Sequence, residues 1–276
     1  MAHAVAVKVE RAFGADRRTT QSVDRACVVL AYVGERQEPG VSLGEIAQLL
    51  AVHKSTGLRL LASFESSGLV QRDTSTGRYH LGFGIVALAG NLLGSLSILR
   101  ISDPLLRRLA EATQQTVNLA VRYRNEILNI EQIPAPDVQR SPDWLGRRAP
   151  LHTGAAAKAL LGHLEDAEIG AYIQTIQASV HPRQLEVLSA DLREIRRRGF
   201  AINQGEVNPE VMSVGAPIFN ASGHCCASIS IAWYRHDEHG DLAPARIGEL
   251  TGPLLETART ISRQLGHNVQ HIAWLA

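Results

Sequence analysis

The sequence has few or none of the features that mark several common classes of protein. Its 276 residues include only three cysteines, an odd number without the spacing of a metal site. No apolar run reaches the roughly 18 residues that a membrane span needs. The first nine residues lack the charged start and long apolar block of a secretory signal. We therefore expect a protein of the reducing cytoplasm that has no membrane partner.

A large excess of charge of one sign is also missing. The formal net charge is +1, and the first 85 residues hold 10 basic and 8 acidic residues. Bulk charge therefore gives no basic field that would attract nucleic acid, so any DNA affinity must come from a local group of residues. Hydrophobic residues make up 45% of the chain, enough for two packed cores, and the length favours two domains.

The strongest local pattern lies in residues 41–81. Two apolar stripes at helical spacing predict two short helices: Leu43, Ile46, Ala47 and Leu50, then Leu58, Leu61, Ala62 and Phe64. Ser42 and Glu45 have the spacing of a capping box, and Gly68 can end the second helix. Short strands at 69–73 and 78–81 then flank a turn. This order predicts a winged helix-turn-helix, which places the start of its second helix in a DNA major groove.

The segments on either side of this pattern are simpler. We expect residues 1–19 to be a mobile tail and residues 22–34 to form a helix capped by Ser22. Its buried stripe would be Val23, Ala26, Cys27, Leu30 and Ala31. Residues 84–98 are apolar almost all round, so a helix there must be covered. We expect it to join two domains and pack against a second copy of the chain; the alternative is burial within its own subunit.

Beyond residue 100 the pattern changes to mixed strands and helices. Pro104 is expected in the first turn of a helix that ends near Thr113. Strands are predicted at 116–123, 126–133, 200–203, 211–217 and 225–233, and helices at 154–163, 165–174, 185–198 and 244–265. Arg124 and Asn125 would turn the first hairpin. This order predicts an α+β domain in which helices pack on an antiparallel sheet.

Several segments together resemble the IclR family of bacterial transcriptional regulators. They are SVDRA (22–26), KST (54–56) with RLL (59–61), GLV (68–70), GRYHLG (77–82), GRRAPLH (146–152), KAL (158–160), RRGFA (197–201) and API (216–218). The resemblance covers about residues 20–266. It implies a tail (1–19), a winged helix-turn-helix domain (20–83), a linker helix (84–99) and a GAF-like α+β effector domain (100–276).

The predicted DNA contacts lie at the start of the second helix and on the wing. Side chains there can reach base edges or phosphates, and the helix start itself favours an anion. The residues are Lys54, Ser55, Thr56 and Arg59 on the helix, and Arg72 and Arg78 beside the wing turn. For each arginine the alternative is an ordinary solvated charge. The expected partner is a pseudo-palindromic DNA operator, bound by a homodimer or homotetramer.

Carried over residue by residue, the resemblance also implies an effector pocket. Backbone N–H groups would hold a carboxylate at the start of the 154–163 helix, above a polar floor and an apolar wall. These residues are Ala155 and Ala156 at the helix start, Asn203, Ser213 and Ser230 in the floor, and Ala149 and Val211 in the wall.

The sequence departs from the family pattern at four positions. Asn203 stands where members often have Asp, Ser213 where they have Cys, Ala157 where they have Gly, and Ala232 where they have Ser. An Asn lacks the negative charge and adds donors, so we expect a neutral or anionic ligand that accepts hydrogen bonds. An aromatic or short aliphatic acid or amide would fit. The alternative for Asn203 and the serines is hydrogen bonding at strand ends.

Other groupings of polar residues do not predict a second chemistry. Residues 236–239 with Asp241, and residues 224–226, lack the geometry of a metal site. Thr153 with His152 and Lys158 gives no oriented triad. The arginines at 193 and 196–198 are expected on a solvated helix face. We thus predict no catalytic residue, metal or cofactor.

Taken together, the sequence predicts a repressor of a catabolic operon that responds to a small organic effector. The alternative is an enzyme that acts on a small metabolite in the second domain, with the first domain as an interaction module.

Overall fold

The computed structural model describes residues 20–36, 39–95, 97–135, 143–234 and 243–267. Its contacts divide the chain into two compact units, Met1–Ser95 and Leu96–Ala276. Among the sequence predictions, the tail at 1–19 and the polar cluster at 236–241 lie outside the described residues. No described helix is long and apolar enough to cross a membrane.

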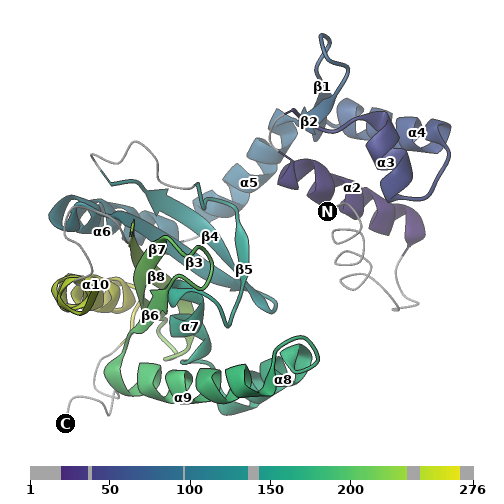
Figure 1. Ribbon diagram of the computed structural model, residues 1–276. Helices are drawn as coiled ribbons and strands as arrows, with labels where there is room; N and C mark the ends of the chain where they lie inside the picture. The colour runs from purple at the N-terminus through teal and green to yellow at the C-terminus, as the bar shows by residue number, and fades with distance from the viewer. Residues whose placement is uncertain (1–19, 37–38, 96, 136–142, 235–242, 268–276) are drawn as a thin grey trace. The chain divides into compact units, whose positions relative to one another are not determined.

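The first unit is a small helical domain with a two-stranded wing (Figure 1). Its elements are α2 (Gln21–Glu35), α3 (Leu43–Leu49), α4 (Lys54–Ser66), β1 (Val70–Arg72), β2 (Tyr79–Leu81) and α5 (Phe83–Ser95). Ser42 and Glu45 form the predicted capping box at the start of α3. Gly68 follows α4 with a φ of +71°, which a residue without a Cβ adopts at little cost. The winged helix-turn-helix prediction is confirmed.

The buried face of two helices differs from the predicted stripe. In α2 the core residues are Val29, Tyr32 and Val33, whereas Val23 is 58% exposed and Cys27 is exposed. Residues 28–33 are apolar on every side, so periodicity alone could not select the face that packs. The cap of α2 is also Thr20 and not Ser22. In α4, Leu61 and Phe64 are buried, but Leu58 and Ala62 are exposed.

The second unit is built on one six-stranded antiparallel sheet. Its strands are β3 (Thr116–Tyr123), β4 (Glu126–Ile133), β5 (Arg148–Pro150), β6 (Ala201–Gln204), β7 (Val211–Phe219) and β8 (Cys225–Tyr234). Their order across the sheet is β5-β4-β3-β8-β7-β6. The short strand β5 is absent from the sequence prediction, because a three-residue strand has too little alternation to be recognised. The predicted α+β class with an antiparallel sheet is confirmed.

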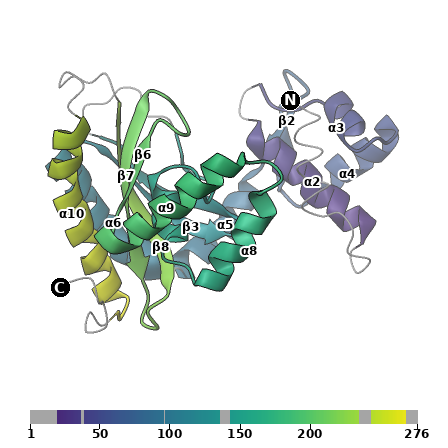
Figure 2. The same ribbon diagram turned by 60° about the horizontal axis from the view of Figure 1, so that its bottom comes forward.

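Helices cover both faces of this sheet (Figures 1 and 2). One face packs on α6 (Ser97–Thr113) and α10 (Ala243–Gln264), and the other on α7 (Ala155–Leu161), with α8 (Asp166–Ile176) and α9 (Pro182–Arg198) outside it. Along β3, Val117 and Leu119 join the α6/α10 core, while Ala120 joins the α7 core. Alternate residues of the sheet therefore face α6 and α10 on one side and α7 on the other.

The helices before the sheet can be compared with the prediction only in part. Residue 96 lies outside the described residues, so α5 is described to Ser95 and α6 from Ser97, and the prediction of one helix over 84–98 stays a prediction. Pro104 lies inside α6 and not in its first turn. Proline removes one backbone hydrogen bond from a helix. Buried Leu106 and Leu109 show that packing on the sheet outweighs this loss.

The arginine run of α9 is not simply a solvated face. Arg196 donates to the carbonyl oxygens of Gly162 and Leu164, and its guanidinium also pairs with Asp166. The guanidinium of Arg198 lies 4.7 Å from the ring centre of Phe200. The contacts of Arg196 join α9 to the α7–α8 connection, which sequence spacing alone cannot reveal.

Candidate DNA interface and ligand pocket

The start of α4 is an exposed polar surface. His53 precedes the helix, and its Nδ1 accepts a hydrogen bond from the backbone N–H of Ser55. Lys54, Thr56 and Arg59 are exposed, and no described ion pair engages their side chains. The opposite face of α4 is buried through Leu61 and Phe64. The predicted contact residues of this helix therefore face solvent together, next to the positive end of the helix dipole.

The angle between α3 and α4 depends on two small residues. A Cβ added to Gly57 would lie 3.3 Å from Leu43 Cδ1, so the helices cross where α4 has no side chain. Ala51, in the turn between them, has a φ of +51°, and its neighbour Val52 donates to Ala47 O. A left-handed alanine is uncommon and costs conformational energy. The turn is therefore held in place by the packing of the two helices.

The wing has a compact turn with its own polar contacts. Asp73 accepts hydrogen bonds from the backbone and side chains of Ser75 and Thr76, and these bonds hold its pKa well below the usual value. Arg72 is exposed beside the turn. Arg78 instead points inward and donates to Gly40 O and to Glu45 Oε2, at 3.1 and 2.9 Å. Of the two wing arginines, Arg72 is thus the more available to DNA.

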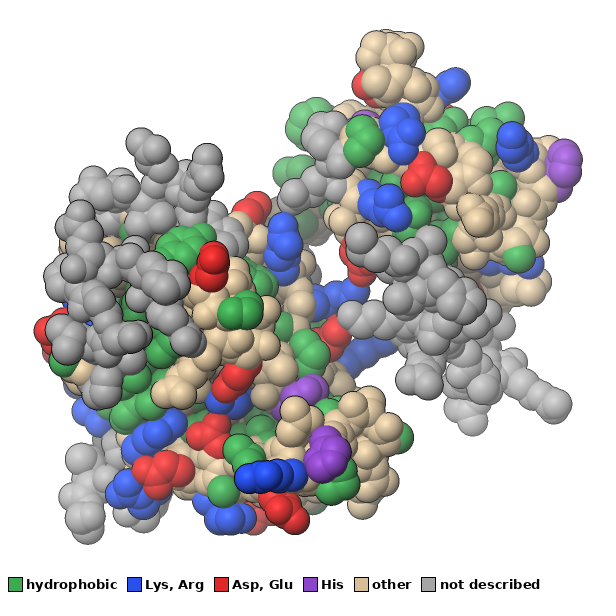
Figure 3. Space-filling view, in the orientation of Figure 1, with side chains coloured by type: hydrophobic (Ala, Val, Ile, Leu, Met, Phe, Trp, Pro, Cys, Tyr) green, Lys and Arg blue, Asp and Glu red, His purple; other side chains and the backbone are tan. Residues whose placement is uncertain are grey.

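On the face shown in Figure 3, the basic side chains of the described part of this unit are separated and form no large patch. This distribution agrees with the small net charge of the sequence. Affinity for a polyanion must come from a few well-placed contacts and from the helix start.

In the second unit, a pocket lies between the sheet and the start of α7. It encloses about 550 Å³ of free space, including the part open to solvent. All seven residues predicted for an effector site line it: Ala149, Ala155, Ala156, Asn203, Val211, Ser213 and Ser230. The lining also includes residues that the sequence analysis missed, among them Asn118 and Asn129. The Asn in VNLA at 117–120 was a visible polar interruption of an apolar strand, but its direction could not be assigned.

The floor of the pocket is a row of polar residues on neighbouring strands. Asn118 on β3 pairs in register with Ser230 on β8, and Asn203 on β6 pairs with Ser213 on β7. These four residues are buried. The sheet therefore presents short polar side chains upward to the pocket, while its opposite face is apolar.

A glycine lets α7 approach the sheet. A Cβ added to Gly215 of β7 would lie 2.5 Å from the carbonyl carbon of Ala155 and 2.6 Å from its oxygen. Contacts this short with backbone atoms are not tolerated, so only glycine permits this packing. Gly215 therefore determines how closely the start of α7 approaches the sheet. The sequence analysis did not assign this role.

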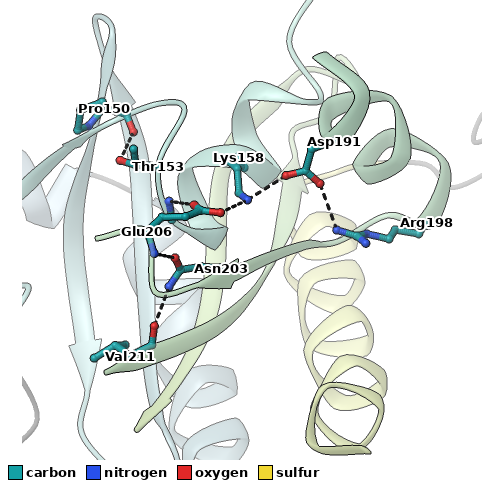
Figure 4. A network of polar contacts seen from close by, with 9 residues as sticks. Pro150, Thr153, Lys158, Asp191, Arg198, Asn203, Glu206 and Val211 are labelled. Atoms are coloured by element: carbon teal, nitrogen blue, oxygen red, sulfur yellow. Dashed lines mark hydrogen bonds and ion pairs between the residues drawn. The ribbon is translucent and has the colours of Figure 1, made fainter. Parts of the chain in front are cut away.

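A network of charged groups joins α7, α9 and the loop after β6, outside the lining of this pocket (Figure 4). Lys158 of α7 is buried, and its Nζ lies 2.9 Å from Asp191 Oδ2 and 2.5 Å from Glu206 Oε1. Glu206 Oε2 accepts a hydrogen bond from the backbone N–H of Gly154, at 2.9 Å. Arg198 lies 3.6 Å from the other oxygen of Asp191. The positive charge of Lys158 is thus balanced within the domain.

Asn203 holds the loop that carries Glu206. Its Nδ2 donates to Val211 O at 3.1 Å, and its Oδ1 accepts from the backbone N–H of Glu206 at 2.9 Å (Figure 4). The hydrogen bonding at a strand end, which was the alternative for this residue, is therefore present. It leaves one N–H and one lone pair of the amide for another molecule.

The residues considered as a nucleophilic group line one cavity, but each bonds to a different partner and they form no triad. Thr153 donates to Pro150 O, His152 shares a 2.6 Å hydrogen bond with Tyr172, and Lys158 is ion-paired. Burial lowers the pKa of His152 and raises that of Tyr172 to about 12, so both stay neutral near pH 7.

The vicinal cysteines offer no reactive thiolate either. Burial raises the pKa of the thiols of Cys225 and Cys226. No cluster of potential metal ligands occurs within the part of the chain that the structure describes.

Comparison with known proteins identifies both units. Residues 22–74 match the IclR helix-turn-helix domain, and residues 90–263 match the C-terminal domain of the bacterial transcriptional regulator IclR. KipR of Bacillus subtilis, an HTH-type transcriptional regulator, is 31% identical over 234 residues, 83% of this chain and 92% of KipR. The HTH-type transcriptional repressor AllR of Klebsiella pneumoniae is 30% identical over 254 residues, 91% of this chain and 92% of AllR.

The fold agrees with these matches. The crystal structure of IclR from Thermotoga maritima superposes with a TM-score of 0.67 at 25% identity and covers 89% of this chain and 99% of that one. The family and these relatives are transcriptional regulators and not enzymes, so the enzyme alternative is excluded. With its helix-turn-helix unit, its sheet unit and these relatives, this chain belongs to the IclR family of DNA-binding transcriptional regulators.

Proposed function

We propose that this regulator represses a catabolic operon and is released from DNA by a small organic effector bound in the second unit. The effector is a carboxylate or an amide, with an aromatic or aliphatic body. One observation supports this proposal above the others: the seven residues expected to bind an effector line one pocket. Residues far apart in the sequence, on α7 and on four strands, meet there.

On the DNA side, we propose that Arg59, Lys54, Ser55 and Thr56 enter the major groove and that Arg72 reaches the backbone. Their exposure at the start of α4 supports these roles. Arg78 contributes by fixing the wing to α3 through Glu45, and it can reach DNA only if it leaves that ion pair.

The active species is proposed to be a homodimer or a tetramer formed from dimers. Hydrophobic side chains of α5 are exposed, with Phe83 at 81%, Val86 at 63% and Leu88 at 62%. A helix with so much exposed apolar surface is expected to pack against another protein surface. A second copy of the chain would bury it and would also supply the second DNA-recognition helix. Light scattering of Leu88→Glu should show a smaller species than the parent chain, with Val187→Glu on the second unit as a matched surface control.

The test of the function is selection of DNA from a random pool of duplexes by the full chain. The enriched site should be two-fold symmetric, with half-sites about one helical turn apart. Arg59→Ala should lose about 1–3 kcal/mol of binding free energy on that site, measured by fluorescence anisotropy. Arg183→Ala, an exposed arginine of the second unit, should bind as the parent does. Selection that enriches no sequence would refute the proposed function.

A further inference from the structure

The described lining of the pocket has no ionisable side chain. It consists of alanine, valine, isoleucine, tryptophan, glycine, serine, threonine and asparagine. Lys158, one turn into α7, is already bound to Asp191 and Glu206. The N–H of Gly154, at the start of α7, already donates to Glu206. A carboxylate in this pocket would lose its hydration without gaining a counter-ion, which is unfavourable, and a neutral ligand avoids that cost.

One polar group of the floor is not engaged by the protein. Asn118 is 5% exposed, and its buried Oδ1 has no hydrogen-bond partner among the described residues. The other asparagines of the lining differ. Asn129 donates to Arg147 O, Asn203 holds two backbone groups, and Asn208 Oδ1 accepts from the N–H of Glu210. A buried carbonyl oxygen left unpaired destabilises a fold, and this one belongs to a residue that lines the pocket, where another molecule can complete its bonding.

The position of Asn118 makes it available to a bound molecule. It lies on β3 in register with Ser230 of β8, and both residues line the pocket. Ser213 on β7 adds a second hydroxyl to the same floor. Ile127, Trp144 and Val211 supply apolar wall around these groups. The site therefore combines one unpaired amide with two hydroxyls and an apolar surround.

We propose that Asn118 recognises the amide group of a neutral ligand, a primary carboxamide or a lactam. Both present an N–H and a C=O side by side. The ligand N–H donates to Asn118 Oδ1, and the ligand carbonyl accepts from Asn118 Nδ2, so two hydrogen bonds form between matching amides. The apolar wall takes the hydrocarbon body. This inference rests on the proposed function, since it treats the pocket as the effector site, and it narrows the effector to the amide class.

Calorimetry of the full chain with matched pairs tests the proposal. The probes are benzamide against benzoate and acetamide against acetate, with 2-pyrrolidinone as the lactam. The amides should bind more tightly than the acids of the same shape. Asn118→Leu keeps the size of the side chain and removes the amide, so it should weaken amide binding about tenfold or more. Asn118→Asp should weaken it as well and should not create affinity for the acids.

Thermal unfolding supplies a second readout and a control. Asn118→Leu removes an unpaired buried group, so the ligand-free protein should melt at a higher temperature than the parent. Ser228→Ala removes another buried, unpaired group from the same sheet, outside the described pocket lining. It should leave amide binding unchanged, which shows that the loss in Asn118→Leu is specific to the pocket.

Three outcomes would overturn the proposal, and each differs from the outcome that would refute the proposed function. Tighter binding of the acids, undiminished amide binding by Asn118→Leu, or no heat from any amide each refutes it. Acid binding would leave the pocket as an effector site for anions, so the proposed function would stand. The proposed function fails separately, if selection enriches no DNA sequence.

Discussion

The two units use polar residues in opposite ways. In the winged helix-turn-helix, Lys54, Thr56 and Arg59 are exposed on a rigid frame, and no described ion pair engages them. In the sheet unit, Lys158 and Asn203 are buried and bonded to the protein on two sides. A surface that reads a polyanion needs available donors, whereas a pocket that selects a small molecule needs fixed walls. The comparison predicts that substitutions of these exposed side chains affect DNA binding, whereas substitutions of the buried, bonded side chains of the sheet unit affect folding.

The largest effect is expected at the glycine under α7. Gly215→Ala places a Cβ within 2.5 Å of the backbone of Ala155, so the sheet unit should lose about 3 kcal/mol or more. Urea unfolding followed by circular dichroism measures this loss. Gly170→Ala makes the same chemical change in α8, where an added Cβ meets nothing within 4 Å, and should stabilise the helix. Equal stability of the two variants would contradict the role given to Gly215.

The second largest effect is expected at the buried side chain of Lys158. Lys158→Met keeps the length of the side chain but removes the charge between Asp191 and Glu206. Because both carboxylates are partly exposed, the loss should be about 2–3 kcal/mol, less than for a fully buried pair. Chemical denaturation measures it. A Lys158→Met variant that is as stable as the parent and differs only in DNA binding would contradict this comparison of the two units.

Acidification should reduce the stability of the winged unit, by less than the two substitutions above reduce the stability of the sheet unit. Hydrogen bonds from Ser42, then the charges of Arg78 and Arg36, hold the pKa of Glu45 below its usual 4.5. A carboxyl with a lowered pKa contributes stability that is complete above 4.5 and is lost as the pH falls through its lower folded value. The winged unit should thus lose on the order of 1 kcal/mol in that acidic range.

The control for this titration is Glu45→Gln, which cannot titrate. Its unfolding free energy should be lower near neutral pH and should change less on acidification than that of the parent. A parallel decline in both proteins would assign the acid sensitivity to other carboxyls, such as Glu168, whose pKa is lowered by the hydrogen bond from Arg122.

The smallest effect is expected at the helix-turn-helix turn. Ala51 adopts a φ of +51°, where a Cβ is strained, so Ala51→Gly should relieve the strain. The greater freedom of glycine in the unfolded chain offsets part of the gain, which leaves about 0.5 kcal/mol of added stability. Ala62→Gly, inside the exposed side of α4, should instead destabilise by about 1 kcal/mol. Differential scanning calorimetry can compare the pair.

Much of this architecture could be predicted from sequence because its signals are local. The capping box at Ser42, the turn at Arg124 and the end of α9 at Gly199 each depend on residues within a few positions of one another. The gathering of the pocket residues was implied by family resemblance and not by spacing. Non-local facts were missed: the outward direction of Cys27, the ion pair of Arg78 with Glu45, and the contact between Gly215 and Ala155. Each depends on a partner distant in sequence or on a choice between two apolar helix faces.

The loop after β6 connects the pocket with the ion pair of Lys158. Val207 and Asn208 line the pocket, and their neighbour Glu206 neutralises Lys158. We therefore expect a ligand that displaces Val207 to move the carboxylate of Glu206 as well and to weaken its ion pair with Lys158. The charge balance at Asp191 of α9, which also pairs with Lys158, would then change although Asp191 does not line the pocket.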